Sequence, residues 1–400
     1  MMSAPEAQPR AWLAPVAVLF GTGWGANQFS PLLLVYRHHL NLGTGTLEAM
    51  FGVYALGLIP GLMLAGPLSD VRGRRAVVIP ASALGILSSV VLVAGAHSVP
   101  LIFAGRLLAG VSSGAVFAAG TAWVRETSLP PIGLATRDDA ARRAAIAMTA
   151  GFGLGPLVAG LLAQWAPQPG RVPYVPHIAL MVVVLIALRG VPETVAAGGR
   201  ALRLAVPGVR GTRFLAVVAP MAPWVFAAPA IAFALMPSVV GAGHVHDAIA
   251  VAAVVTTLTA LSGVLIQPLA RRLDARGAGI GAAVAGLLVL AAGLVLAAVT
   301  AHEQQVWLLV PGAVILGAAY GLCLVAGLIE VQRMASDDAL AGLTAVYYAL
   351  TYVGFAAPYA LALAAGVASY PLLLALTAAL ALATAAHVGR GSRRAVDAAR

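Results

Sequence analysis

Long apolar runs are the feature that most constrains how this chain can fold. Hydrophobic residues make up 61% of its 400 residues and charged residues only 10%, far below the roughly 25% charged residues of ordinary soluble domains. An apolar run of about 20 residues can cross the hydrocarbon core of a bilayer as a helix. These observations predict an all-α integral membrane protein.

Twelve such runs lie between clusters of arginine, glycine, proline or histidine, and they predict twelve transmembrane helices. Their approximate limits are 12–36, 46–69, 76–96, 99–124, 143–166, 174–190, 214–240, 247–270, 278–300, 305–330, 339–366 and 370–388. The first run is far longer than the apolar part of a signal peptide and has no convincing cleavage site, so we expect it to remain as a helix.

The placement of arginine predicts the orientation of these helices. All 24 basic residues are arginine, and 21 of them lie at the termini or in even-numbered connections; Arg37 and Arg171 lie in odd-numbered ones and Arg106 lies inside a span. By the positive-inside rule both termini are cytoplasmic, in a multi-pass protein of the cytoplasmic membrane. The net charge of +10 therefore reflects topology, and nucleic acid is not an expected partner because no basic run alternates with aromatic residues.

An internal repeat divides the chain into two halves. Pro67 and Pro268 begin similar segments 201 residues apart, and a glycine series matches at an offset of 207: Gly105, Gly110 and Gly114 with Gly312, Gly317 and Gly321. We expect six-helix bundles over 1–188 and 214–400, joined by a cytoplasmic linker over 189–213 that could hold a short interfacial helix at 200–206. Transporters with parallel repeats of this kind bind solute between their halves.

The segment GPLSDVRGRR, residues 66–75, concentrates charge between two apolar runs. It resembles the loop signature of the major facilitator superfamily, although Val71 stands where the family usually has a basic residue. GRLLAG at 105–110, GFGLGPLVAG at 151–160 and PET at 192–194 also resemble motifs of that family. The resemblance implies twelve helices in two pseudo-symmetric bundles, and the motifs lie nearest to those of drug:proton antiporters.

The resemblance also implies a cytoplasmic gate. In the family, the residue matching Asp70 lies against the start of span eleven and pairs with the arginine matching Arg74. Helix termination and positive charge alone would explain the arginines of this turn, but not the carboxylate. The expected gate residues are Gly66, Asp70, Gly73, Arg74, Arg75 and Glu126.

Two features within the spans have both a functional and a structural interpretation. Arg106 either faces a cavity, where it could bind an anionic group or steer protons, or extends to the outer headgroups. The pattern Gly151, Gly155, Pro156 and Gly160 resembles the helix-bending motif of antiporters, with Ala159 replacing one expected glycine. The same ridge of small residues could instead allow spans five and eight to pack closely.

Polar and aromatic side chains within the spans are candidates to line a solute cavity, and many of them could instead serve packing. The candidates are Asn27, Gln28, Tyr54, Arg106, Ser113, Trp224, Tyr320, Tyr348 and Tyr352, with Ser112 and Tyr347 beside them. Few amides lie at depth, so an aromatic, amphipathic or weakly anionic solute fits better than a sugar. No acid is expected near the midplane, and Glu48, in the first turn of span two, is interpreted as complementing its helix dipole.

These observations predict a secondary transporter of a small organic solute that works by alternating access, as a proton-coupled exporter or, alternatively, as an uncoupled facilitator or an uptake symporter of organic anions. A channel would need a filter sequence, and an enzyme would need clustered acids or histidines at depth. His244, His246 and Asp247 are interpreted as a solvated loop rather than a metal site. No cofactor and no metal are expected, Cys323 is alone and forms no internal disulfide, and we expect a monomer in the bilayer whose partners are the solute and protons.

Overall fold

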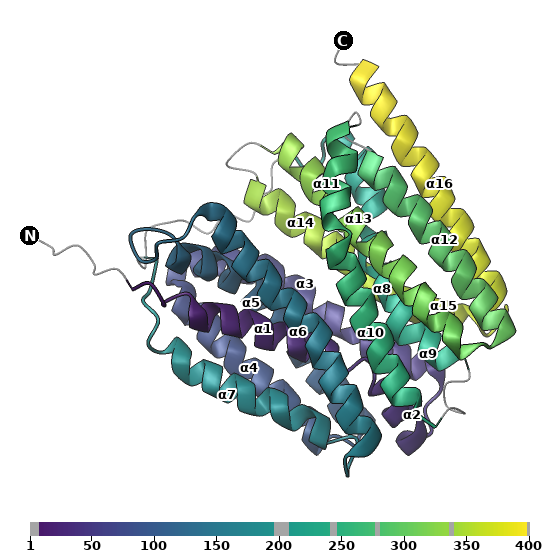
Figure 1. The fold of residues 1–400 in the computed structure, drawn as a ribbon, viewed down its shortest axis with the longest axis horizontal. Helices are drawn as coiled ribbons and strands as arrows, with labels where there is room; N and C mark the ends of the chain where they lie inside the picture. The colour runs from purple at the N-terminus through teal and green to yellow at the C-terminus, as the bar shows by residue number, and fades with distance from the viewer. Residues whose placement is uncertain (1–7, 196–207, 241–245, 277–280, 336–339, 398–400) are drawn as a thin grey trace, which may run out of the picture. The chain divides into compact units, whose positions relative to one another are not determined.

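The computed structural model describes residues 8–195, 208–240, 246–276, 281–335 and 340–397. The elements over these residues are helices joined by turns, and none of the described residues forms a strand. The interfacial helix expected at 200–206 lies outside the described residues. The chain divides into two compact units, which are described separately below (Figure 1).

Unit 1 comprises Met1–Leu32 and Val53–Leu204. Within it α4 packs against α5 and α7, and α1 packs against α5 and α6. Its elements are α1 (Leu13–Asn27), most of α3 (Thr44–Arg72), α4 (Arg74–Ala94), α5 (Val99–Ser128), α6 (Arg137–Trp165), the short 3-10 helix η1 (Val172–Tyr174) and α7 (Val175–Leu188).

Unit 2 comprises Leu33–Gly52 and Ala205–Arg400, so α3 begins in unit 2 and continues into unit 1 as one helix. In this unit α12 packs against α13 and α16, and α13 also packs against α8 and α10 (Figure 1). Its other elements are α2 (Leu33–Leu40), η2 (Phe214–Val218), α8 (Ala219–Ala230), η3 (Ile231–Leu235), α9 (Met236–Val239), α10 (Ala248–Leu265), α11 (Gln267–Arg276), α12 (Gly281–Glu303), η5 (Val306–Leu308), α13 (Leu309–Met334), α14 (Leu340–Val353), η6 (Gly354–Ala356), α15 (Ala357–Ala364) and α16 (Tyr370–Asp397).

Ten helices among the described residues are long and apolar enough to cross a membrane, and the shorter apolar helix Val172–Leu188 occupies the sixth predicted run. The first run does not form the continuous helix expected over 12–36. It divides into α1 and α2 with turns over 28–32, because Pro31 has no N–H to donate and disfavours a helical conformation at the residue before it.

Matched glycines create matched helix contacts in the two units. A Cβ on Gly110 or Gly114 would collide with the backbone of α3 at Tyr54 or Leu58. A Cβ on their repeat counterparts, Gly317 and Gly321, would collide with the backbone of α10 at Thr259 and Gly263. Only glycine allows backbones to approach so closely, so the repeat seen in the sequence corresponds to one packing geometry used twice.

The glycine ridge of the fifth predicted span packs against α1. A Cβ on Gly155 would lie 2.7 Å from Trp24 Cα, and one on Gly151 would collide with the Phe20 carbonyl. The expectation that these two residues face span eight is therefore wrong. The reason is that Gly23 leaves a matching recess on α1, where an added Cβ would lie 2.8 Å from the Met148 carbonyl oxygen.

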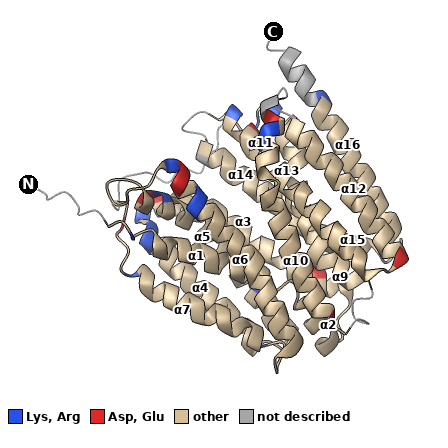
Figure 2. Cartoon of the chain, viewed as in Figure 1, with Lys and Arg blue, Asp and Glu red and all other residues tan. Residues whose placement is uncertain are grey.

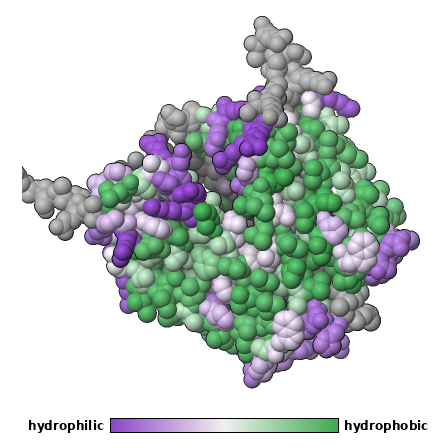
Figure 3. Space-filling model, in the orientation of Figure 1, coloured by the Kyte–Doolittle hydropathy of each residue, from purple (hydrophilic) through white to green (hydrophobic). Residues whose placement is uncertain are grey.

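Charged residues of each unit gather at the ends of its helices, and their sides are almost free of charge in this view (Figure 2). Hydrophobic residues cover the visible sides of the helices (Figure 3). Large apolar side chains such as Leu56 and Leu380 are exposed, at 69% and 59%. Water would disfavour so much apolar surface, whereas lipid chains solvate it.

Candidate functional site

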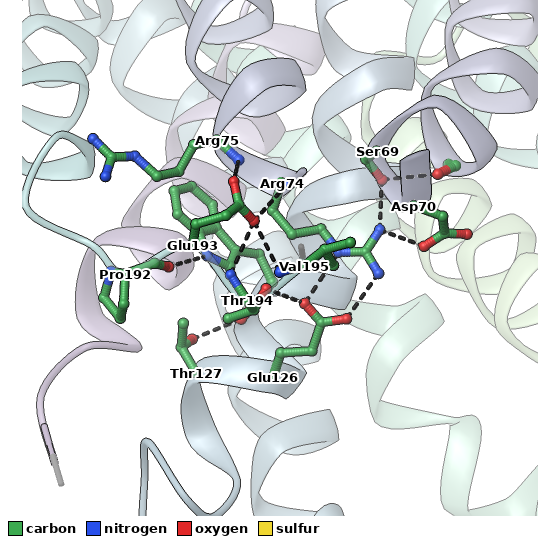
Figure 4. A network of polar contacts seen from close by, with 12 residues as sticks. Ser69, Asp70, Arg74, Arg75, Glu126, Thr127, Pro192, Glu193, Thr194 and Val195 are labelled. Atoms are coloured by element: carbon green, nitrogen blue, oxygen red, sulfur yellow. Dashed lines mark hydrogen bonds and ion pairs between the residues drawn. The ribbon is translucent and has the colours of Figure 1, made fainter. Parts of the chain in front are cut away.

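A cluster of charged residues lies at helix ends of unit 1, and we call it the Arg74 cluster (Figure 4). The guanidinium of Arg74 is buried and binds two carboxylates. Nη1 lies 2.7 Å from Asp70 Oδ1, while Nε and Nη2 donate to the two oxygens of Glu126 at 3.0 and 2.8 Å. Ser69 Oγ accepts from Nη1 at 2.6 Å and donates to the Gly66 carbonyl at 2.8 Å. The side chain of Arg74 thus joins the ends of α3 and α5 to the start of α4.

Glu193 caps the N-terminus of α4 within the same cluster. Its two carboxylate oxygens accept the backbone N–H groups of Arg74 and Arg75 at 2.8 and 2.9 Å (Figure 4). Gly73 precedes them with φ +98°, and a Cβ there would lie 2.6 Å from Glu193 Oε2. Glycine is required by both the backbone conformation and the approach of the carboxylate. A carboxylate at this position satisfies N–H groups that the helix leaves free and complements the helix dipole.

Other contacts fix the segment after α7 to this cluster. Thr194 Oγ1 donates to Glu126 Oε2 at 2.5 Å, and Trp123 Nε1 donates to the Pro192 carbonyl at 3.1 Å. Arg75 Nη2 donates to the Arg189 carbonyl at 2.8 Å. All six predicted gate residues therefore lie in one cluster, whose additional members Ser69, Glu193 and Thr194 were not among them.

A second charge cluster lies in unit 2, and we call it the Arg333 cluster. Arg333 Nη2 lies 2.6 Å from Asp274 Oδ2, and Nη1 lies 2.8 Å from Glu330 Oε1. Arg213 Nε donates to the other oxygen of Glu330 at 2.8 Å, and this hydrogen bond raises the pKa of Arg213 above its ordinary value. The Glu330 side chain is fully buried, so pairing with two guanidinium groups offsets its desolvation.

The two clusters differ in where the cation lies. At an offset of 204 residues Asp274 corresponds to Asp70, and Ala278 corresponds to Arg74. The matched glycines of α5 and α13 are 207 residues apart, and at that offset Arg333 corresponds to Glu126. A comparison that looks for a repeated arginine therefore fails, although pairing Asp274 with the arginine on α13 would have found this cluster.

Arg106 is enclosed within unit 1, with a residue exposure of 1%. Its guanidinium carbon lies 4.4 Å from the ring centroid of Phe29 and 4.6 Å from that of Tyr54. Tyr54 shares a hydrogen bond with Ser113, and Arg106 Nη1 is 3.5 Å from the Ala26 carbonyl oxygen. The structure thus places Arg106, Tyr54 and Ser113 together and excludes the interpretation in which Arg106 extends to the headgroups.

The two predicted amides of the first span have separate environments. Asn27 Nδ2 lies 3.5 Å from the Phe152 carbonyl oxygen on α6, at the limit of a hydrogen bond. Gln28 is buried and donates from Nε2 to Ser89 Oγ at 3.3 Å. The nearby candidate Ser112 donates to the Ala81 carbonyl at 2.7 Å, which is a helix-packing role.

Unit 2 contains an aromatic stack around Phe226. Its ring stacks on Tyr352 at a centroid distance of 4.4 Å and on Phe355 at 5.1 Å, and Tyr320 lies 5.4 Å away. Tyr320 and Tyr352 were predicted cavity residues, but the phenylalanines were not, because aromatic residues in an apolar run are usual packing residues. Tyr352 and Phe355 are buried within this stack, at 6% and 5% exposure.

The remaining aromatic candidates make packing contacts. Trp224 Nε1 donates to Thr384 Oγ1 on α16 at 3.2 Å. Tyr347 is fully buried and donates to the Cys323 and Leu324 carbonyl oxygens at 3.2 and 3.1 Å. Tyr348 is half-buried beside it, with ring centroids 5.8 Å apart.

Glu48 is fully buried in unit 2, in the second turn of α3 rather than the expected first turn. Ser238 Oγ lies 3.2 Å from Glu48 Oε1, but the same hydroxyl also lies 3.0 and 2.9 Å from the carbonyl oxygens of Ala234 and Leu235. One hydroxyl proton must serve three acceptors. Glu48 Oε2 is buried with no hydrogen-bond partner, so this carboxyl is poorly satisfied as an anion.

No group of three histidine, cysteine or acidic residues that could hold a metal ion occurs within the described part of the chain. His246 lies 3.2 Å from Asp247 in an exposed loop, and His244 lies outside the described residues.

The fold and these clusters define a multi-pass membrane protein, and comparison with known proteins gives its family. Residues 13–357 match the Major Facilitator Superfamily. The chain belongs to this superfamily and is a transporter.

Solved structures share the whole fold. A POT family transporter in complex with 5-aminolevulinic acid has a TM-score of 0.78 and 12% identity, with 96% of each chain covered. A mutant of the nucleoside transporter NupG has a TM-score of 0.72 and 13% identity, with 95% of this chain and 98% of that chain covered. At such identities the likeness concerns the fold alone.

Curated relatives match a shorter region. Multidrug resistance protein MdtL of Shigella flexneri serotype 5b is 36% identical over 88 residues, and MdtL of Escherichia coli O9:H4 is 35% identical over 88 residues. In both cases the match covers 22% of this chain and 22% of the relative.

Proposed function

We propose that this transporter exports a small amphipathic or weakly anionic aromatic solute across the cytoplasmic membrane in exchange for protons. The observation that carries the proposal is Arg106, a buried cation that contacts two aromatic rings in unit 1. Buried charges in membrane segments mark solute or ion pathways. Such an arrangement can bind an anionic group beside an aromatic ring.

Three observations support the finer parts of the proposal. The similarity of 88 residues to multidrug resistance proteins favours export of organic solutes. The aromatic stack around Phe226 favours an aromatic solute. Glu48, a buried carboxyl with one oxygen that lacks a hydrogen-bond partner, favours proton exchange, because burying a carboxylate with so few hydrogen bonds costs free energy that a bound proton removes.

The mechanism in this proposal is alternating access by a monomer without a cofactor. Six-helix halves over 1–188 and 214–400, joined by the linker 189–213, move about the solute, and both termini are cytoplasmic. The Arg74 cluster is the gate on the cytoplasmic side. Its helix ends are joined by side-chain contacts that a movement of a few ångströms would break.

The test measures solute flux by the purified protein in liposomes. We expect saturable transport with counterflow, driven by a pH gradient, because a carrier binds its solute before it moves. Flux without saturation contradicts a carrier. Saturable flux that ignores the pH gradient contradicts proton exchange and favours a facilitator, while uptake driven by the gradient favours a symporter.

Variants of Arg106 test in the same assay whether this buried arginine is needed for transport. Arg106→Ala should lower transport at least tenfold, and Arg106→Lys should restore it only in part because the planar guanidinium against the two rings is lost. Arg171→Ala, which removes an exposed arginine, is the control. Near-normal flux in Arg106→Ala with normal expression would remove Arg106 from the site.

A further inference from the structure

A chain of buried hydrogen bonds links three helices of unit 1. His177 Nε2 on α7 lies 3.1 Å from the Gly21 carbonyl oxygen on α1, and His177 Nδ1 lies 2.9 Å from Ser89 Oγ on α4. Gln28 Nε2, just after α1, lies 3.3 Å from the same Ser89 oxygen. Gln28, Ser89 and His177 are exposed by 1%, 1% and 3%. The chain therefore runs from Gly21 to Gln28 without contact with solvent.

The elements packed against α7 offer no anionic partner for the His177 imidazole, so we interpret this ring as neutral. They are chiefly α1, α4 and η1. No residue of α1 is titratable, Arg74 and Arg75 lie at the far end of α4 from the start of α7, and η1 contributes only Tyr174. None of these elements carries a carboxylate that would stabilise an imidazolium in this buried place.

The direction of each hydrogen bond in this series follows from the Gly21 carbonyl at its end. A carbonyl oxygen can only accept, so His177 Nε2 carries the proton and donates to Gly21. In the neutral ring Nδ1 is then an acceptor, and the Ser89 hydroxyl must donate to it. Since that hydroxyl has one proton, Ser89 Oγ can only accept from Gln28, which identifies the nearer end of the amide as its NH₂ group.

With these hydrogen-bond directions, one acceptor is left outside the hydrogen-bond chain. Gln28 Oε1 is buried and has no hydrogen-bond partner. Four of the six such side-chain atoms in the described residues lie within positions 22–30 of unit 1, which is a strong concentration. The same stretch contributes Phe29 and the Ala26 carbonyl to the surroundings of Arg106. Unsatisfied buried acceptors are costly, so a donor from another molecule would bind there favourably.

We propose that Gln28 Oε1 accepts a hydrogen bond from the transported solute, and that Ser89 and His177 are positioning residues that fix the orientation of the amide. The solute class is an aromatic molecule that carries a hydroxyl or N–H donor. This inference rests on the proposed function, since it assumes that an aromatic solute enters unit 1.

The test compares binding of matched solutes by the full-length protein in detergent, using titration calorimetry. The pairs are 4-hydroxybenzoate and 4-methoxybenzoate, 2-naphthol and 2-methoxynaphthalene, and 4-hydroxybenzyl- and 4-methoxybenzyl-trimethylammonium, so that each pair differs by one donor and the three pairs differ in charge. We expect about tenfold tighter binding of the hydroxyl member of whichever pair binds, as for one well-made hydrogen bond.

Three variants test whether the buried hydrogen-bond chain causes this preference for a hydroxyl donor. Gln28→Met keeps the shape but removes the acceptor, and it should bind both members of the pair equally. Ser89→Ala frees the amide to rotate and should reduce the preference several-fold. Ser88→Ala is the matched control, because Ser88 is equally buried on α4 and donates to the Gly105 carbonyl outside the chain; it should keep the preference.

The outcomes separate this inference from the proposed function. If no solute of any charge binds, the proposed function fails and the inference fails with it. If solutes bind without a donor preference, or if Gln28→Met keeps the preference, only the inference fails. Nitrogen-15 NMR of labelled histidine, assigned with His177→Asn, gives a solute-free check: we expect a proton on Nε2 of His177, and a neutral ring protonated on Nδ1 would overturn the polarity of the chain.

Discussion

Arg333, at the end of α13, forms ion pairs with two carboxylates. Removing its side chain should show how much the stability of the Arg333 cluster depends on it. Asp274 is almost fully buried and lies 2.6 Å from the guanidinium, whereas Glu330 also has Arg213. Loss of Arg333 should therefore affect Asp274 more than Glu330, which keeps its ion pair with Arg213.

Replacing Arg333 by leucine should therefore destabilise the protein. Removing one partner of a fully buried ion pair costs about 3–5 kcal/mol, and we expect a smaller loss here because the Arg333 side chain is 38% exposed and water screens the pair. Thermal unfolding of purified protein should show a midpoint several degrees lower. The control Arg271→Leu removes an exposed arginine from α11, and an equal midpoint in the two variants would show that the Arg333 cluster contributes nothing.

Residues that pair locally could be predicted from the sequence, whereas those that meet through tertiary packing could not. Asp70 and Arg74 are four positions apart at a helix junction, so their ion pair was foreseeable. Glu193 reaches α4 from 119 positions away, and only the motif resemblance hinted that it mattered. His177 lies in an apolar run, and no neighbour in the sequence indicates that it forms hydrogen bonds with Ser89 and the Gly21 carbonyl.

At the scale of helices, close packing depends on a few glycines rather than on the apolar surface as a whole. Gly321 and Gly312 lie on the same helix, α13, yet an added Cβ would collide with the Gly263 carbonyl oxygen at the first and meet nothing within 4 Å at the second. Substituting alanine at these two positions therefore separates the cost of a steric contact from the gain in helix propensity.

Gly321→Ala should destabilise the protein, while Gly312→Ala should be neutral or slightly stabilising. Overpacking costs about 1–3 kcal/mol, which exceeds the gain of up to about 1 kcal/mol from replacing glycine in a helix. Thermal unfolding of the two variants measures the difference. Equal stability would mean that α10 and α13 can separate at no cost.

The succession of helices was largely predictable from the apolar runs, but their interruptions were not. Prolines break the first run, and they also accompany the wide helical turns η2 and η3 that flank α8. Length and hydropathy identify a run that can cross a membrane, whereas the local backbone depends on how neighbouring helices satisfy the groups that proline leaves free.

At the scale of the whole molecule, the Arg74 cluster should influence which side of the transporter is open. Asp70 contributes one of the two carboxylates of Arg74 and is 41% exposed, while the bidentate contact with Glu126 does not depend on it. The fold should therefore survive the loss of the Asp70 charge, since a partly exposed pair contributes little to stability.

Asp70→Asn should slow transport several-fold and shift the equilibrium toward the state open to the cytoplasm. A change of about 1 kcal/mol in a balanced two-state equilibrium alters the populations about fivefold. Labelling of single cysteines on either side, in a Cys323→Ser background, should show more accessibility from the cytoplasm and less from outside. Asp138→Asn, at an exposed position of α6, is the control, and unchanged accessibility with normal turnover would reduce Asp70 to a helix-end carboxylate.

The exchanged positions of the cations have an evolutionary consequence. If the two halves descend from one ancestral half by duplication, an arginine was gained or lost at the position of Arg74 and Ala278, and the charge was reversed at the position of Glu126 and Arg333. An intermediate that lost a cation first would have left a buried carboxylate unpaired. The viable order is therefore to gain the new cation before losing the old one, and in unit 2 Arg213 would have supported Glu330 throughout that interval.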